Sequence, residues 1–307
     1  MKRAAKGKLS RLATERANPA SQDLDLKSSL EITRIINAED AKVAAAVKQA
    51  LPEIARAIDL IATALKQGGR LIYIGAGTSG RIAALDAAEC PPTFNTDPKT
   101  VQFVIAGGTK ALGSAVEGNE DSRKLGEREI ARKKPGKRDV VVGIAASGRT
   151  PFTIAAIDLA RKRGAKTIAV TCNRNSPLGK AAHLAIVTEV GPEVIAGSSR
   201  MKAGTAQKMV LNMLSSGAMV RLGYVYGNLM VNVHLKNKKL VERGTTILQQ
   251  AAGINRETAR RALTSAGNNV PAALVMLKTG VGRSDAVRAL RSSRGNVRQA
   301  IAQARAL

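Results

Sequence analysis

The chain has 307 residues, of which 44% are hydrophobic and only 2% aromatic. This balance is typical of helices packed on a parallel sheet, and the length suits one large domain with a smaller appendage. It excludes a disordered chain, and the absence of any apolar run near the ~20 residues that span a bilayer argues against a membrane partner. The basic start, Met1 to Lys8, leads into polar sequence instead of an apolar signal core, so we expect a cytoplasmic protein.

The net charge of +26 is concentrated in three segments. Residues 1–16, 123–138 and 256–307 together supply 19 of these charges. A basic face suits nucleic acid, because binding releases counterions from the phosphate backbone. However, no stacking aromatic residues are interleaved with the Lys and Arg side chains, and Trp is absent. We therefore predict a solvated basic surface and no nucleic-acid partner.

Helical spacing of apolar residues from 28 to 66 predicts long amphipathic helices that end at Gly68-Gly69. Short apolar runs that end in small residues or Asn then alternate with helical patterns. These runs are Arg70–Gly75, Val101–Ala106, Val140–Ile144, Thr167–Cys172 and Leu184–Val190. The alternation predicts a parallel sheet with helices on both faces, and in such sheets ligands bind at the carboxyl ends of the strands.

A long Met- and Leu-rich helix is predicted over residues 199–222, where the Met side chains indicate a core or a dimer contact instead of a cofactor site. Residues 262–274 are then echoed 27 residues later by residues 289–301, which predicts a repeat of helix, glycine turn and helix. This tail resembles ubiquitin-associated-type three-helix modules, and we infer no ubiquitin binding. The predicted domains are an arm (1–27), a main α/β domain (28–244) and a small helical domain (245–307).

Two turns that carry hydroxyl side chains follow predicted strands. The first, Gly75–Arg81, contains Thr78 and Ser79 and opens a helix, where free backbone N–H groups and the helix dipole favour an anion. Its GxGxxG spacing also occurs in dinucleotide sites, but hydroxyls in the turn suit a monophosphate or a sugar better. The second turn carries Ser147 and Thr150. Alternatively, both are tight strand-to-helix connections with Ser/Thr caps.

The cysteines and histidines indicate no metal or redox site. Cys90 and Cys172 cannot form a disulfide framework and have no metal-ligand spacing, so we interpret them as ordinary thiols. His183 and His234 are too isolated in the sequence to suggest a metal site. We therefore expect no cofactor and no metal.

The second turn resembles the phosphate loop of sugar isomerase (SIS) domains, which bind phosphosugars on a three-layer α-β-α sandwich with a five-stranded parallel sheet. That loop usually begins with a serine, whereas this chain has Ala145, so Ser147 and Thr150 are the matched hydroxyls. Further stretches are similar to N-acetylmuramic acid 6-phosphate etherases, and the resemblance covers residues 10 to about 300. These stretches are Thr14-Glu15 with Asn18, Ile74–Arg81, Asp86–Thr93, Ala106–Gly108, Ala115–Ser122 and Gly197–Thr205.

The resemblance implies catalysis by Glu89 and Glu120, with Glu89 as the proton donor, in a homodimer without a cofactor. Loss of lactate from C3 of an opened aldose needs removal of the C2 proton, which the C1 carbonyl acidifies, and protonation of the leaving ether oxygen. Two carboxyl groups in different protonation states supply both steps, and water adds back with their roles reversed. From the sequence pattern alone, both glutamates would be interpreted as solvated charges. Pro91-Pro92 are expected to stop the helix that Glu89 ends.

Four residues of a later loop are also expected at the sugar or its phosphate, namely Glu193, Ser198, Ser199 and Lys202, although Lys202 is alternatively a surface charge. The predicted reaction converts the phosphosugar to N-acetylglucosamine 6-phosphate and D-lactate, in the recycling of the bacterial cell wall. Two alternatives stay open. One is a phosphosugar aldose–ketose isomerase on the same fold, and the other is a sugar-phosphate sensor without enzymatic activity.

Overall fold

A computed structural model describes residues 13–116, 118–233, 235 and 237–306, so the basic start, Glu117 and His234 lie outside the described residues. The chain divides into two compact units. The first consists of Met1–Ala87 and Lys99–Ser215, and the second of Ala88–Pro98 and Ser216–Leu307. The predicted domain boundary at residue 245 falls within a helix of the second unit, α10 (Lys238–Ala252).

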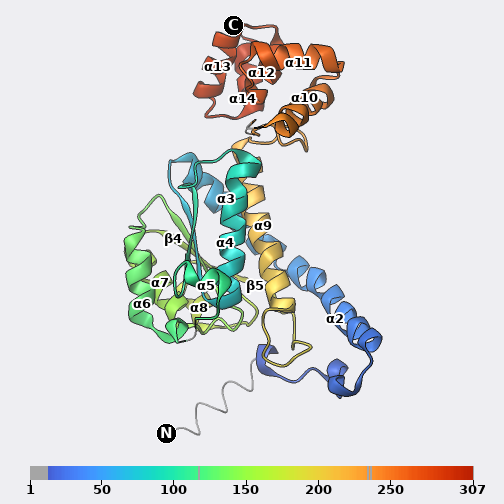
Figure 1. The fold of residues 1–307 in the computed structure, drawn as a ribbon. Coiled ribbons are helices and arrows are strands. Elements are labelled where there is room, and N and C mark those ends of the chain that lie inside the picture. Colours follow the sequence, from blue (N-terminus) through green and yellow to red (C-terminus); the bar gives the residue numbers. More distant parts are fainter. Residues whose placement is uncertain (1–12, 117, 234, 236, 307) are drawn as a thin grey trace. The chain divides into compact units, whose positions relative to one another are not determined.

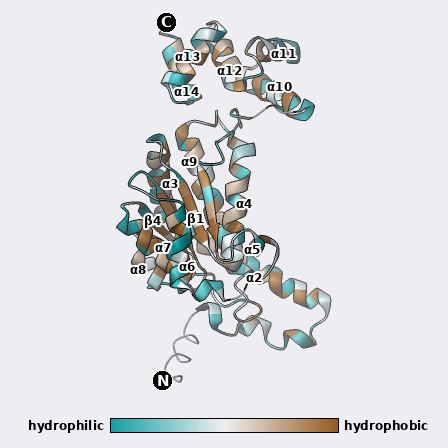
Figure 2. Ribbon diagram, turned by 60° about the vertical axis from the view of Figure 1, so that its left-hand side comes forward, coloured by the Kyte–Doolittle hydropathy of each residue, from teal (hydrophilic) through white to brown (hydrophobic). Residues whose placement is uncertain are grey.

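The first unit is built on a five-stranded parallel sheet with the strand order β2-β1-β3-β4-β5, which confirms the predicted fold class. Every residue of β1 and β3 is buried, because helices cover both faces of the sheet. Figure 2 shows β1 as hydrophobic, in keeping with this burial. The strands are β1 (Leu71–Gly75), β2 (Val101–Ile105), β3 (Val140–Ile144), β4 (Lys166–Thr171) and β5 (Leu184–Val187).

Helices lie on both faces of the sheet and complete three layers (Figure 1). Alternate residues of β1 show the two sides. Ile72 and Ile74 belong to a buried cluster with Phe152 and Ile157 of α7, whereas the Tyr73 hydroxyl donates to Asp86 of α4. One side carries α6 (Arg123–Arg132), α7 (Pro151–Lys162) and α8 (Pro177–Ala181), and the other carries α3 (Leu51–Lys66), α4 (Gly77–Phe94) and α9 (Lys202–Leu222).

The remaining elements of the first unit are a long helix and several short turns. Helix α2 (Ser29–Gln49) begins with a capping box, in which Ser28 and Glu31 satisfy each other's backbone N–H groups. Short elements complete the unit, namely α5 (Lys110–Gly113) and 3-10 turns at Ala13–Glu15, Pro19–Ser21, Leu24–Leu26 and Asn119–Asp121. None of the described helices is long and apolar enough to cross a bilayer.

The second unit contains the predicted repeat. Its two helix pairs enclose a hydrophobic cluster that includes Leu263, Leu274 and Ile301. Asn269 and Asn296, which stand 27 residues apart, each accept a backbone hydrogen bond at the start of the second helix of a pair. The helices are α10 with α11 (Arg256–Ser265), α12 (Val270–Thr279), α13 (Arg283–Ser292) and α14 (Val297–Ala304).

Helix α4 differs from the prediction at both ends. It begins at Gly77 instead of Arg81, so the hydroxyl-rich turn is already its first turn. The expectation that Pro91-Pro92 stop the helix is wrong, because α4 continues to Phe94. The fixed φ of proline is compatible with a helical backbone, although proline has no N–H to donate and its ring crowds the preceding turn. The helix ends where Asn95 adopts a left-handed conformation with φ of 53°, its N–H donating to the Pro91 carbonyl oxygen at 2.9 Å.

Candidate functional site

The first hydroxyl-bearing turn follows β1 at the carboxyl edge of the sheet. Gly80 lies so close to β2 that a Cβ atom there would be 2.5 Å from a side-chain carbon of Ile105, so glycine lets the helix start directly on the sheet. Thr78 is half-buried, whereas Ser79 is buried and its hydroxyl donates to Gln207 Oε1 on α9 at 2.9 Å. Ser79 therefore joins α4 to α9, and substrate contacts by Thr78 and Ser79 stay predictions.

The second turn joins β3 to α7 at the same edge. Ser147 is half-buried, and its Oγ accepts the N–H of Arg149 at 3.2 Å. Gly148 has φ of 65° and packs against Ser176, where a Cβ atom would be 2.4 Å away. Thr150 occupies the N-cap of α7 and makes no side-chain capping bond. Its hydroxyl and the free N–H groups of the first helical turn are therefore available to an anion.

A loop at residues 191–201 carries Ser198 and Ser199, both half-buried. Glu193, near the start of the loop, is fully buried. Its carboxylate accepts hydrogen bonds from the backbone N–H groups of Lys202 and Ala203, each at 2.9 Å, and so joins the start of the loop to the start of α9. A carboxylate at this position is stabilised by the positive end of the α9 dipole. The structure thus assigns Glu193 a capping role, and a substrate contact by Glu193 stays a prediction.

Lys202 is also buried, so the alternative of a surface charge is wrong. Its side chain is 1% exposed, and its ammonium lies 2.5 Å from a carboxylate oxygen of Glu39 on α2. Asn18, in the segment that precedes α2, donates to the same oxygen at 2.9 Å. Burial alone raises the pKa of Glu39, but hydrogen bonds from Lys202, Lys42 and Asn18 outweigh it and lower the pKa to about 2.

The two predicted catalytic glutamates are exposed. Glu89 lies on α4 in the second unit, and Glu120 lies in the 3-10 turn Asn119–Asp121 of the first unit. The approach of their carboxyl groups to one substrate stays a prediction. One turn before Glu89, the carboxylate of Asp86 is buried and accepts from Tyr73 at 2.8 Å, as well as from two side chains of α9. Burial raises the pKa of Asp86, and these donors counteract it.

Sequence comparisons identify the family. Residues 53–161 match the model of the glucokinase regulatory protein N-terminal SIS domain, and residues 135–216 match that of the SIS domain. N-acetylmuramic acid 6-phosphate etherases from Symbiobacterium thermophilum and Aeromonas hydrophila are 57% and 53% identical to the chain. Each alignment covers 88% of this chain, and 89% and 90% of the respective relatives. The chain belongs to the N-acetylmuramic acid 6-phosphate etherase family.

Solved structures agree on the fold. A phosphoheptose isomerase from Francisella tularensis is 18% identical, with a TM-score of 0.51 over 63% of this chain and 100% of that chain. At this level of identity the likeness shows the fold alone. The assignment to the etherase family therefore rests on the sequence relatives, while the structural neighbour supports the parallel sheet and its layers.

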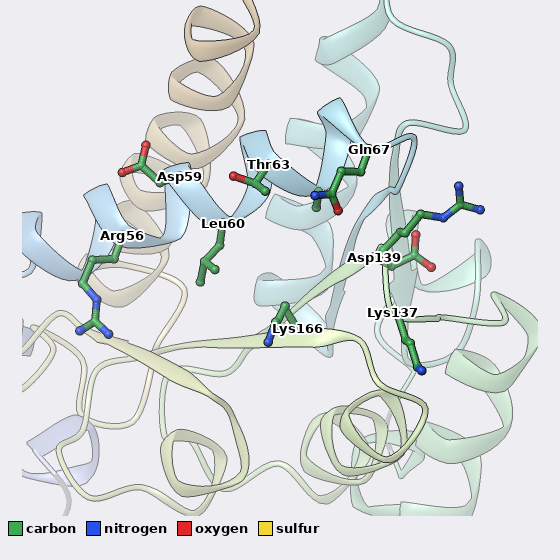
Figure 3. A pocket seen from close by; sticks show the side chains of 10 residues that line it. Arg56, Asp59, Leu60, Thr63, Gln67, Lys137, Asp139 and Lys166 are labelled. Atoms are coloured by element: carbon green, nitrogen blue, oxygen red, sulfur yellow. The ribbon is translucent and has the colours of Figure 1, made fainter.

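A groove of about 520 Å³ lies at the amino edge of the sheet, and Figure 3 shows the side chains that line it. It is lined by one face of α3, including Arg56 and Thr63, and by residues at the amino ends of two strands, including Asp139 before β3 and Lys166 at the start of β4. It contains none of the predicted site residues. The groove is therefore separate from the carboxyl edge of the sheet, where the hydroxyl-bearing turns lie.

The described residues hold no group of three or more His, Cys, Asp and Glu side chains that could bind a metal ion. His183 Nδ1 pairs with the Thr167 hydroxyl at 2.7 Å, which makes it a structural histidine at the start of β5. Cys90 and Cys172 are both buried, and burial raises the pKa of the Cys172 thiol to about 12. A thiol with so high a pKa is inert as a nucleophile.

Sequence reasoning missed Glu39. This glutamate is one of several charged residues in a predicted amphipathic helix, but its spacing from the apolar residues distinguishes it. Glu39, Val43 and Val47 are the buried residues of α2 and stand four residues apart, so the glutamate shares the apolar face of its helix. A carboxylate on such a face needs a buried partner, which here is Lys202.

Proposed function

We propose that the chain cleaves the lactyl ether of N-acetylmuramic acid 6-phosphate, giving N-acetylglucosamine 6-phosphate and D-lactate. The observation that carries this proposal is the identity of 53–57% over 88% of the chain to etherases of that name. Relatives this similar over nearly their whole length favour the same reaction over the isomerase and sensor alternatives, which share only the fold.

The phosphate of the substrate would bind at the carboxyl edge of the sheet. Helices α4 and α7 both start there, and each presents backbone N–H groups together with hydroxyl side chains. Ser147 and Thr150 are the proposed phosphate ligands, and Thr78 and Ser79 line the neighbouring turn. Hydroxyls of the 191–201 loop, on Ser198 and Ser199, would contact the sugar.

The reaction is an elimination followed by an addition. One carboxylate takes the C2 proton of the opened aldose, the electron pair forms the C2–C3 double bond, and the C3–O bond breaks. The departing lactate oxygen receives a proton from Glu89, and Glu120 is the proposed base at C2. Water then adds to C3 and a proton returns to C2, with the two carboxyl groups in reversed roles, so that one water is consumed for each lactate released.

Release of D-lactate from N-acetylmuramic acid 6-phosphate tests this proposal. Glu89→Gln and Glu120→Gln should each lower kcat by about 10²–10⁴, the usual contribution of a general acid or base. Glu127→Gln, at an exposed position on α6, is the matched control and should keep full activity. Full turnover by either of the first two variants would remove that residue from the mechanism. Ketose formation without lactate would establish the isomerase, and binding without any conversion would establish the sensor.

We further propose that the protein acts as a cytoplasmic homodimer in the recycling of cell-wall amino sugars. Twofold pairing is the commonest symmetry of soluble oligomers, and the substrate is a phosphorylated intracellular sugar. Light scattering of the purified protein should give twice the chain mass of 32.2 kDa. A monomeric mass at assay concentration would overturn the dimer.

A further inference from the structure

The ion pair between Glu39 and Lys202 is the most deeply buried charged contact of the described residues. The two side chains are 4% and 1% exposed. Each charge loses its hydration on burial, so such a pair adds little to stability compared with apolar residues of similar size. The pair does, however, hold its two side chains in one fixed arrangement, and thereby fixes the segments that carry them.

The ion pair is connected to the 191–201 loop through Asn18 of the N-terminal arm. Asn18 uses its amide group as a bridge, donating to Glu39 at 2.9 Å and to the carbonyl oxygen of Pro192 at 3.1 Å. Ser21 adds a second link from the arm, donating to the carbonyl oxygen of Val194 at 2.7 Å. In Figure 1 residues 13–27 of the arm, in blue, lie beside the loop that leads into α9.

Both ends of the loop are therefore fixed by buried polar groups. The first end is held at Pro192 and Val194 by the arm. The second end is held at Lys202, whose side chain binds Glu39 and whose N–H binds Glu193. Between these ends stand the two half-buried serines, while the loop residues from 195 to 197 are exposed. The backbone hydrogen bonds of the serines themselves are local, since the N–H groups of Ser198 and Ser199 donate to the carbonyl oxygens of Ile195 and Gly197 within the same loop.

We propose that Asn18, Glu39 and Lys202 are positioning residues of the substrate site. They form a clamp that holds Ser198 and Ser199 in the geometry for binding the phosphosugar, and none of the three contacts the substrate. The inference rests on the proposed function and deepens it. It replaces the predicted substrate contact of Lys202, since the Lys202 ammonium is enclosed and already bound to a carboxylate.

The clamp predicts a particular kinetic change. A loop that binds the ground state and the transition state equally contributes to KM and leaves kcat unchanged. Asn18→Ala removes the bridge while leaving both charges in place, and it should raise KM for N-acetylmuramic acid 6-phosphate about tenfold with kcat within about threefold of the wild type. A general loss of folded protein would instead lower kcat at constant KM.

Two further variants separate the clamp from ordinary packing. Glu39→Met with Lys202→Met removes both charges together, so no unpaired charge is left in the interior, and it should fold but show the same rise in KM. Lys42→Met is the matched control. Lys42 binds the other oxygen of Glu39 from the surface, with its own side chain 63% exposed, and its removal should leave KM unchanged.

Hydrogen exchange measures the clamp without substrate. Amides of residues 194–201 should exchange about tenfold faster or more in Asn18→Ala than in the wild type, with the β1 and β3 amides unchanged. Calorimetric binding of N-acetylglucosamine 6-phosphate should weaken in parallel. Wild-type values for exchange and binding in both Asn18→Ala and the double variant would overturn the clamp, as would an equal effect of Lys42→Met. If the wild-type protein releases no lactate, the etherase proposal fails, and exchange and binding still decide the clamp.

Discussion

The buried Glu39 carboxylate should make the free energy of unfolding depend on pH, and a variant without this charge should lack that contribution. The folded protein holds the pKa of this group at about 2, compared with an ordinary value of 4.5. Because the folded pKa is the lower one, the stabilisation is complete above pH 4.5 and is lost as the pH falls toward 2. Replacing both partners, in Glu39→Met with Lys202→Met, removes this dependence together with the charges.

The size of the effect follows from the pKa difference. One pKa unit corresponds to about 1.4 kcal/mol, so the shift from 4.5 to about 2 amounts to about 3 kcal/mol. At pH 3 the folded protein still keeps the group ionised, whereas the unfolded chain is mostly protonated. By proton linkage, about 2 kcal/mol of this stabilisation has then been lost.

Urea denaturation at pH 6, 5, 4 and 3 measures this difference. Between pH 6 and pH 3, the free energy of unfolding should fall by about 2 kcal/mol more in the wild type than in the double variant, since all other acids are common to both. At pH 6 the two proteins should have similar stability. Parallel curves across the whole range would refute the reasoning, because Glu39 would then titrate alike in the folded and unfolded states.

Three further substitutions, with Gly136→Ala as a control for the first, test the packing and the anion site. Gly126→Ala should destabilise by about 3 kcal/mol in thermal or urea unfolding, because its Cβ would lie 2.0 Å from a backbone carbonyl oxygen of α7, whereas Gly136→Ala, with open space around it, should be neutral within about 0.5 kcal/mol. Tyr73→Phe should cost about 1–2 kcal/mol at pH 7 and less in acid, since it removes a donor to the carboxylate of Asp86; a loss independent of pH would contradict that account. Thr150→Val should keep its unfolding midpoint, because the threonine makes no capping bond, and should raise KM about tenfold in the lactate assay; an unchanged KM would exclude it as a phosphate ligand.

Much of the α/β framework could be predicted from the sequence, because its signals are local. Val140–Ile144 is an apolar run bounded by small or charged residues, and it forms β3 with the expected bounds. The repeated Asn269 and Asn296 likewise mark helix starts through a cap that depends on nearby backbone alone. Pro91-Pro92 misled the prediction because proline opposes a helix only where its missing N–H or its ring conflicts with the preceding turn.

The partners of buried charges could not be predicted, because they are brought together by tertiary contacts. Lys202 and Glu39 are separated by 163 positions in the chain. Lys202 was predicted at the substrate or as a surface charge, and Glu39 was not singled out. Asn18 was noted as part of a family motif, but its bridge to Pro192 depends on where the arm packs. The local signals thus identified the turns at the sheet edge, whereas the clamp behind the serine loop needed coordinates.

The measurement that tests the central claim most directly is the fate of solvent oxygen. Incubation of the protein with N-acetylmuramic acid 6-phosphate in ¹⁸O-labelled water, followed by mass spectrometry, reports which carbon–oxygen bond breaks. Elimination and readdition at C3 predict one ¹⁸O at C3 of N-acetylglucosamine 6-phosphate, besides any exchange of the C1 aldehyde oxygen with water, and none in D-lactate. Label in the lactate hydroxyl, or no lactate at all, would contradict the proposed etherase mechanism.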